Sequence, residues 1–225
     1  MWHQACWQPQ NGTKKLRSAS LHRAAISNAI LLNVGAFSKG KRLFDILLSV
    51  CLLTFFGVPM LLLGILIRLT SEGQAIYWSD RIGIHNSIFR MPKFRTMKVN
   101  TPAIATHLLR SPEQHLTRLG KILRRYSLDE LPQLYSVLKG DMSFVGPRPA
   151  LFNQDDLIQL RTAKGVHRLV PGVTGWAQIN GRDELPIPAK VDLDEFYLRN
   201  RCVTLDMRIL FMTVFSVAVS KGITH

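Results

Sequence analysis

The stretch ILLSVCLLTFFGVPMLLLGILI, residues 46–67, is an uncharged and mainly apolar run of 22 residues. A straight α-helix of this length is about 33 Å long, which is enough to cross a hydrocarbon core of about 30 Å. Pro59 lies near the middle of the run and cannot donate a backbone hydrogen bond to the carbonyl of Phe55. The run therefore predicts a membrane helix that is broken or kinked at Pro59.

The charges that flank this run bear on its topology. Every Lys, Arg, Asp or Glu before Asp45 is a Lys or an Arg, and such basic segments prefer the cytoplasm. Helix length alone favours a plain span, which would place the two flanks on opposite sides of the membrane. A re-entrant helix at residues 39–68, which enters one leaflet and returns, would instead leave both flanks and Arg68 on the cytoplasmic face. The motifs described below favour the re-entrant geometry.

The composition predicts an anionic partner. The chain of 225 residues has a formal net charge of +14 and a pI near 10.3, and its length suits one domain plus a membrane element. The basic residues follow an apolar segment and lie among amphipathic stretches, which favours lipid headgroups and phosphates over nucleic acid. Three widely separated cysteines give no disulfide framework and indicate a reducing compartment; they are Cys6, Cys51 and Cys202.

The expected fold class is α+β and mostly helical, with the re-entrant membrane helix, amphipathic interfacial helices and a few short β elements. We expect three regions: a basic and partly disordered extension at 1–38, the membrane helix at 39–68, and a cytoplasmic catalytic domain at 69–225. A β-hairpin is predicted around Gly83 and His85-Asn86, between residues 75–78 and 87–89. A basic amphipathic helix at 116–125 suits either a membrane interface or a solvated surface.

Two further helices are expected after residue 125. The first follows Ser127 and stops at Gly140. The second should begin at Asn153 as the N-cap and end at Gly165. The apolar stretch Ile209–Val219 has 11 residues, too few to cross a bilayer, and it is either core or interfacial.

The most specific local signal is the pair of adjacent carboxylates Asp129 and Glu130. One interpretation is a capping box, with Ser127 as the N-cap and Glu130 at the N3 position. The other is a helix that begins near Pro132, which leaves both acids in the preceding turn. An ionised Asp can attack phosphorus and a neighbouring carboxylate can hold Mg²⁺, so the pair is a candidate catalytic and metal site.

The second signal is Gly146-Pro147-Arg148-Pro149. Pro147 and Pro149 restrict the backbone on both sides of Arg148, so its guanidinium is presented from a stiff loop. An arginine held in this way suits a bidentate phosphate contact. The alternative is that Arg148 caps a helix carbonyl or pairs with Asp141.

With these motifs in order, the chain resembles the small monotopic phosphoglycosyl transferases, a family of bacterial sugar transferases. The resemblance covers nearly everything from Lys39 onward. It departs from the family pattern at Asn86, where many relatives have Gly, and at Val58, where Ser often precedes the proline. The matching pieces are KRLFD at 41–45, the apolar helix broken at Pro59, DRIGIHNSIFRMPKFRTM at 80–97, SLDELPQLYSVLKGDMSFVGPRP at 127–149 and PGVTGWAQINGR at 171–182.

The resemblance implies an enzyme that moves a phosphosugar from a UDP-sugar to polyprenyl (undecaprenyl) phosphate and releases UMP. It implies that Asp129 is the nucleophile that forms a covalent phosphosugar adduct, that Glu130 assists and helps to bind Mg²⁺, and that Arg148 meets the diphosphate. It further implies the cytoplasmic face of the bacterial inner membrane, an anionic lipid bilayer, downstream glycosyltransferases as partners, and a first step in O-antigen, capsule or other surface glycan synthesis. No nucleic-acid partner is expected.

Several other residues are secondary candidates. Phosphate contacts, or internal pairing with Asp141 and Asp45, are expected of four basic residues: Arg81, Lys93, Arg95 and Arg182. Asp45, with Lys41 and Arg42, is expected to anchor the membrane helix at headgroup level, while Trp176 and Gln178 either line a nucleotide site or order their own loop.

A competing hypothesis from a different class is a non-catalytic adaptor on the membrane surface. It rests on the net charge of +14 and the amphipathic stretches. It predicts binding to anionic vesicles that weakens with salt, with no turnover of nucleotide.

Overall fold

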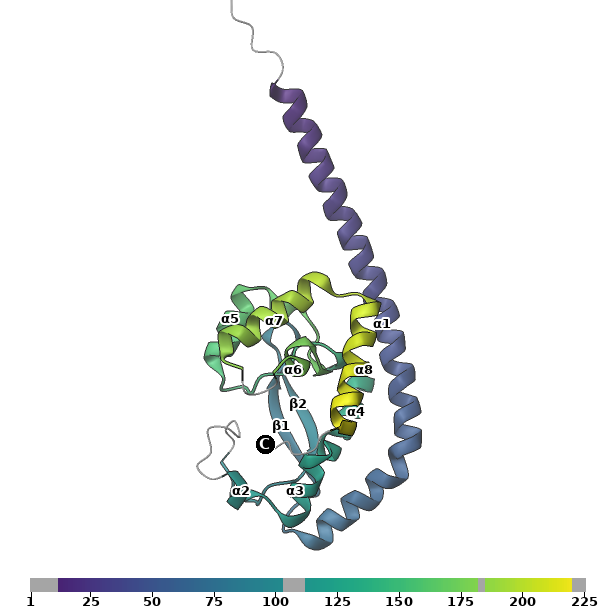
Figure 1. The fold of residues 1–225 in the computed structure, drawn as a ribbon, viewed down its shortest axis with the longest axis vertical. Coiled ribbons are helices and arrows are strands. Elements are labelled where there is room, and N and C mark those ends of the chain that lie inside the picture. Colours follow the sequence, from purple (N-terminus) through teal and green to yellow (C-terminus); the bar gives the residue numbers. More distant parts are fainter. Residues whose placement is uncertain (1–11, 103–111, 182–184, 220–225) are drawn as a thin grey trace, which may run out of the picture. The chain divides into compact units, whose positions relative to one another are not determined.

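The computed structural model of this chain describes residues 12–102, 112–181 and 185–219. Contacts divide the chain into two units, Met1–Lys41 and Arg42–His225, and the matching motifs of residues 80–182 belong to the second. The elements are mostly helical, as expected for the α+β class (Figure 1). In chain order they are α1 Gly12–Thr70, β1 Ile76–Ile82, η1 Ile84–Asn86, β2 Ile88–Phe94, α2 Pro112–His115, α3 Arg118–Arg125, η3 Leu128–Glu130, α4 Gln133–Lys139, β3 Ser143–Val145, α5 Asp155–Ala163, η4 Val166–Arg168, β4 Gly172–Thr174, α6 Trp176–Ile179, α7 Ile187–Asn200 and α8 Val203–Val219.

The predicted hairpin is confirmed and is longer than expected. Strands β1 and β2 pair antiparallel from Ile76↔Phe94 to Ile82↔Ile88. At the turn, Asn86 has a φ of 60°, the left-handed conformation that Asn tolerates better than most residues. The replacement of Gly by Asn therefore keeps the turn. Because side chains alternate along a strand, Lys93 lies on the same face of β2 as the buried Met91.

The segment around the two carboxylates decides between the two interpretations of the sequence. Helix α4 begins only after Pro132, and both acids lie in the short η3 turn before it. Ser127 has a φ of 54° and its side chain makes no capping hydrogen bond, so no capping box forms. Gly140 ends α4 with a φ of 103°, as the sequence predicted.

The remaining helices correct one expectation and agree with another. Helix α5 begins at Asp155 with Gln154 as its N-cap, so the expected N-cap at Asn153 is wrong. The Gln154 side chain instead accepts a hydrogen bond from the backbone N–H of Leu151. The apolar stretch Ile209–Val219, expected to be either core or interfacial, lies in α8 and has both kinds of residue. Ile209 is fully buried, while Phe211 is largely exposed.

Two residues just before the apolar run, Arg42 and Asp45, contact the globular part of the chain. Asp45 is only 3% exposed and accepts a hydrogen bond from the backbone N–H of Phe144. Arg42 donates to the carbonyls of Val137 and Leu138 at the end of α4. The expected headgroup anchor at Asp45 is therefore wrong. These two side chains fasten α1 to the block that joins the carboxylate pair to the Pro-Arg-Pro loop.

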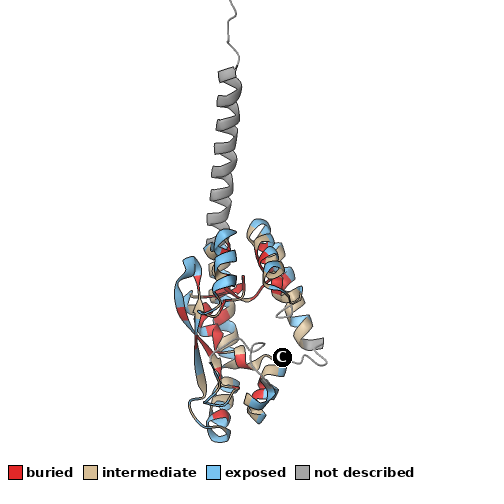
Figure 2. Cartoon of the chain, turned by 90° about the vertical axis from the view of Figure 1, so that its left-hand side faces the viewer, coloured by how far each residue is buried: buried red, intermediate tan, exposed pale blue. Residues whose placement is uncertain are grey.

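The far end of the apolar run is also attached to the globular part. Ile67 is 1% exposed and packs with Phe94 of β2 and Leu123 of α3. Between these attachments the helix is mostly uncovered, and only Asp45, Ser49 and Ile67 are buried among residues 39–70 (Figure 2).

Among the described residues, one helical stretch is long and apolar enough to cross a membrane, Lys39–Thr70. Pro59 lies inside α1, which continues without interruption to Thr70. The C-terminal part of α1, which leads to β1, bends (Figure 1), so the expected break is a bend and not a gap.

Candidate active site

The η3 turn places Asp129 in an unusual environment for a carboxylate. Asp129 is only 8% exposed. Within the part of the chain that the structure describes, the carboxylate forms no hydrogen bond and no ion pair. Buried carboxylates are ordinarily paired, because an unpaired charge away from water is costly. Asp129 is therefore a buried carboxyl group whose oxygens have no partner among the described residues.

Glu130 has the opposite environment, because one of its oxygens has two hydrogen-bond partners. Its Oε1 accepts hydrogen bonds from Lys93 Nζ at 2.9 Å and from Arg148 Nη2 at 2.7 Å. Burial alone would raise the pKa of Glu130. The charges and hydrogen bonds of Arg148 and Lys93 together outweigh burial and lower that pKa well below its usual range. Glu130 thus stays ionised and joins the hairpin to the Pro-Arg-Pro loop.

The pKa of Asp129 shifts in the other direction. Burial raises this pKa, and the charge of Glu130 adds to the rise. The nearby cations Lys93, Arg124 and Arg148 act against the rise without removing it. One turn of chain therefore holds two carboxylates with different properties, one firmly ionised and one more basic and unpartnered.

The loop Gly146–Pro149 is fixed by backbone contacts with the segment that follows η4. Strand β3 pairs parallel with β4, Gly146 N–H donates to Thr174 O at 2.9 Å, and Gly172 N–H donates to Pro147 O at 2.9 Å. A Cβ at Gly172 would lie 2.1 Å from the Gly146 nitrogen, so a side chain has no room there. The PGVTG segment thus supports the loop that carries Arg148.

Two further cations lie at the site. Arg81 extends from β1 and donates from Nη1 to the Pro149 carbonyl at 3.2 Å. The pKa of Lys93 is lowered mainly by burial, and the charge of Arg81 contributes to this lowering. Arg124 of α3 is held by a 3.0 Å hydrogen bond from its Nε to Thr96 Oγ1. Arg124 was not among the predicted site residues, and its position five residues before Asp129 was the only signal for it.

The other predicted residues are placed elsewhere. The guanidinium of Arg95 lies 3.3 Å from the Glu72 carbonyl, next to the loop that follows α1, and not at Glu130. Asp141 pairs with Lys139 and not with Arg148. Arg182 lies outside the described residues.

Trp176 and Gln178 order their own segment. Trp176 stacks on Phe196 of α7 with ring centres 5.3 Å apart, and Arg208 of α8 lies over the same ring. Gln178 donates to the Val173 carbonyl. The second of the two sequence interpretations, loop ordering, therefore describes what these side chains contact.

The carboxylate pair fits the sparse ligand set of Mg²⁺. Mg²⁺ commonly takes one or two carboxylates together with substrate phosphates and water. Asp129 has no hydrogen-bond partner among the described residues, while Glu130 already binds Lys93 and Arg148. In the same part of the chain, no three His, Cys, Asp or Glu side chains gather as a preformed metal site. A metal here would therefore depend on phosphate oxygens for much of its coordination.

Two hollows adjoin the site. An apolar groove of about 370 Å³ lies between α1 and the η3 turn. Its wall includes Pro59 and Leu63 of α1, and Leu128 and Leu131, which flank the carboxylate pair in the sequence.

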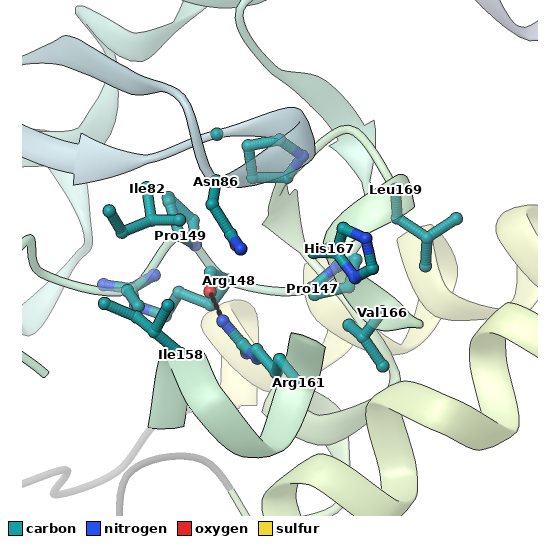
Figure 3. Close-up of a pocket in the computed structure, with 13 residues that line it drawn as sticks. Ile82, Asn86, Pro147, Arg148, Pro149, Ile158, Arg161, Val166, His167 and Leu169 are labelled. Carbon is teal, nitrogen blue, oxygen red and sulfur yellow. Dashed lines mark hydrogen bonds between the residues drawn. The ribbon is translucent and has the colours of Figure 1, made fainter. Parts of the chain in front are cut away.

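The second hollow is a cavity of about 30 Å³ beside the Pro-Arg-Pro loop, and it can hold at most one or two waters. It is bordered by Asn86, Arg161 and His167 (Figure 3).

The chain matches a known protein family and several of its members. The family model described as bacterial sugar transferase matches residues 36–220. The uncharacterized sugar transferase EpsL of Bacillus subtilis (strain 168) is 42% identical over 185 residues, covering 81% of this chain and 89% of the relative.

Two longer relatives have names that state an activity. The UDP-N-acetylgalactosamine-undecaprenyl-phosphate N-acetylgalactosaminephosphotransferase of Aeromonas hydrophila is 32% identical over 215 residues, covering 93% of this chain and 50% of the relative. The UDP-glucose:undecaprenyl-phosphate glucose-1-phosphate transferase of Escherichia coli (strain K12) is 37% identical over 190 residues, covering 81% of this chain and 41% of the relative. The chain spans half or less of the length of these two proteins.

Proposed function

Because the chain belongs to the bacterial sugar transferase family, we propose that it transfers a sugar phosphate from a UDP-sugar to undecaprenyl phosphate and releases UMP. The names of the two longer relatives, from Aeromonas hydrophila and Escherichia coli, contain both undecaprenyl phosphate and a UDP-sugar. The observation that carries the proposal is a buried, unpartnered Asp129 beside Glu130, Lys93, Arg124 and Arg148. When all of these groups are ionised, the three basic side chains outnumber the two carboxylates. The resulting positive charge would favour the binding of a diphosphate.

In the proposed reaction, an oxygen of Asp129 attacks the β-phosphorus of the UDP-sugar. The bond from that phosphorus to the oxygen bridging to the α-phosphate breaks, UMP leaves, and the sugar phosphate stays on Asp129 as an acyl phosphate ester. An oxygen of undecaprenyl phosphate then attacks the same phosphorus and frees the carboxylate. Each half-reaction makes and breaks one P–O bond.

The surrounding residues prepare this attack by charge and position. Burial makes Asp129 more basic and so a better nucleophile than an exposed aspartate, while Lys93 and Arg124 limit the rise of its pKa. Glu130 fixes Arg148 and Lys93 through two hydrogen bonds, so that both cations can face phosphate oxygens. Mg²⁺ held by Asp129 or Glu130 together with the diphosphate would neutralise phosphate charge.

The apolar groove supports the lipid half of the proposal. It joins the exposed surface of α1 to Leu128 and Leu131 on either side of the carboxylates. An isoprenoid chain in this groove would remain in an apolar environment and bring its phosphate end to Asp129.

The two attachments of α1 support a re-entrant position on the cytoplasmic face of the inner membrane. Asp45 at the start of the apolar run and Ile67 at its end both pack against the same polar domain. If the helix crossed the membrane, these two ends would lie about 30 Å apart on opposite sides of the hydrocarbon core. The charged domain, which contacts both ends, would then have to extend through the hydrocarbon, which is costly. Exposed Phe55, Val58 and Leu61 between the attachments would then contact lipid.

The activity is tested with purified protein in bilayer or detergent, a panel of UDP-sugars, undecaprenyl phosphate and Mg²⁺. We expect release of UMP with one or a few of the sugars, loss of release on chelation by EDTA, and recovery when Mg²⁺ is restored. Binding to anionic vesicles without UMP release from any UDP-sugar would contradict the proposal and favour the adaptor hypothesis.

The topology is tested with single cysteines at two exposed positions, Lys39 and Gln74, after the three native cysteines are replaced by serine. In oriented inner-membrane vesicles, an impermeant thiol reagent should label Lys39→Cys and Gln74→Cys from the cytoplasmic side only. Labelling of the two positions from opposite sides would establish a span.

The pH dependence of donor turnover is expected to report Asp129. Attack requires the ionised carboxylate, so kcat/KM for the UDP-sugar should fall as the pH drops through the raised pKa of Asp129. A Glu130→Gln variant removes a charge that raises this pKa and releases Lys93 and Arg148, so its acid limb should move to lower pH. Comparing both proteins on one UDP-sugar cancels the ionisation of the substrate, and an acid limb that stays in place or moves upward would contradict this assignment.

A further inference from the structure

Resting on the function proposed above, we infer that Arg161 and Asp194 act as positioning residues for Arg148. Neither belongs to the carboxylate pair or to the Pro-Arg-Pro loop. Arg161 lies on α5 and Asp194 on α7, two helices that pack against each other. Figure 3 shows the Arg161 side chain directed at the backbone of Arg148.

The geometry gives Arg161 three directed hydrogen bonds. Its Nε and Nη2 donate to the same oxygen of Asp194, at 2.9 and 2.6 Å, and its Nη1 donates to the Arg148 carbonyl at 2.8 Å. The side chains of Arg161 and Asp194 are 10% and 2% exposed. Because a guanidinium is planar and rigid, two bonds to Asp194 fix the direction in which the third N–H points.

The bond to the Arg148 carbonyl bears directly on the site. All three carbonyls of the loop 147–149 are held, Pro147 by the Gly172 N–H, Pro149 by Arg81 and Arg148 by Arg161. Of these three, the Arg161 bond acts on the peptide unit of Arg148 itself. The orientation of that peptide sets the direction of the Arg148 side chain, which reaches Glu130 at 2.7 Å.

The alternative is that the ion pair only joins α5 to α7. A buried ion pair is a weak source of net stability, because desolvation offsets much of the attraction. A second link between the same helices already exists at the surface, where Lys164 of α5 pairs with Asp192 and Glu195 of α7. The surface pair is therefore a matched control: it links the same two helices, and the hydrogen bonds described for Lys164 Nζ go to α7 and not to the loop.

The test compares Arg161→Lys with Lys164→Gln in steady-state UMP release. A lysine keeps the charge but cannot bridge Asp194 and the Arg148 carbonyl in one plane. We expect Arg161→Lys to lower kcat/KM for the UDP-sugar about 10-fold to 50-fold, in line with the cost of small misplacements at active sites. Lys164→Gln should stay within about twofold of the wild type, since it leaves the loop untouched.

A double-mutant cycle separates positioning from general damage. In an Arg148→Ala background, Arg161→Lys should cost less than about twofold, because the side chain that it positions is gone. An undiminished 10-fold loss in that background would overturn the inference. Asp194→Asn, which keeps the side-chain shape, should show the same dependence on Arg148 and replaces Arg161→Lys if the lysine variant does not fold.

The outcomes also distinguish this inference from the function on which it rests. If the wild type releases no UMP from any UDP-sugar, the proposed function fails. If the wild type is active and Arg148→Ala is impaired while folded Arg161→Lys and Asp194→Asn keep full kcat/KM, only the positioning role of Arg161 and Asp194 fails.

Discussion

An Asp129→Asn variant is expected to lose at least about 10³-fold in UMP release from a UDP-sugar, equivalent to roughly 4 kcal/mol or more of transition-state stabilisation. The carboxamide has nearly the shape of the carboxylate but cannot attack phosphorus at a useful rate. Asp129 has no hydrogen-bond partner in the described chain, so the change breaks no described bond. It also removes a buried charge, so thermal stability should be unchanged or higher.

The covalent step can be observed directly in the same experiment. Wild-type protein incubated with a reactive UDP-sugar, without undecaprenyl phosphate, should gain the mass of one sugar phosphate and release one equivalent of UMP. Asp129→Asn should gain no mass, and Glu130→Gln should form the adduct slowly. An adduct mapped to Glu130, or product formed by Asp129→Asn within tenfold of the wild-type rate, would show that the nucleophile is assigned wrongly.

The sequence predicted the local elements around the site because their signals are local. Turn residues at His85-Asn86, the stop at Gly140 and the prolines around Arg148 all act on the backbone of their own segment, and the structure contains each of these features. The two adjacent carboxylates were identified in the same way. Their different environments could not be predicted from the sequence, because burial and the partners of Glu130 come from the distant residues Lys93 and Arg148.

The contacts that the sequence missed are long-range and have no motif of their own. Asp45 meets the Phe144 N–H across 99 positions, and Arg161 meets Asp194 across 33. Charge patterning suggested lipid headgroups for Asp45, but the backbone N–H of Phe144 in β3 provides a buried partner. For Arg95, the motif KFRTM suggested a contact with a substrate phosphate. Its guanidinium instead reaches the Glu72 carbonyl near the end of α1.

Arg148→Ala is the second change with a large expected effect, a loss of about 10² to 10³-fold in kcat/KM for the UDP-sugar. The side chain is partly exposed, reaches Glu130 at 2.7 Å, and lies close enough to Asp129 for its charge to lower the pKa of that carboxyl group. Removal takes away the cation proposed to bind phosphate and leaves Glu130 with Lys93 as its described partner. Arg148→Lys should lose less, about tenfold, because it restores the charge without the planar fork.

Two controls make the Arg148 result specific to the guanidinium. Arg90 lies exposed on the other face of β2, where it stacks over Trp78, so Arg90→Ala should keep activity within about twofold. Free guanidinium ion should partly rescue Arg148→Ala, in a saturable manner, and should not rescue Arg148→Lys, whose side chain occupies the same space. If Arg148→Ala binds and turns over the UDP-sugar like the wild type, Arg148 does not contact the diphosphate, and its bond to Glu130 serves only to hold the loop.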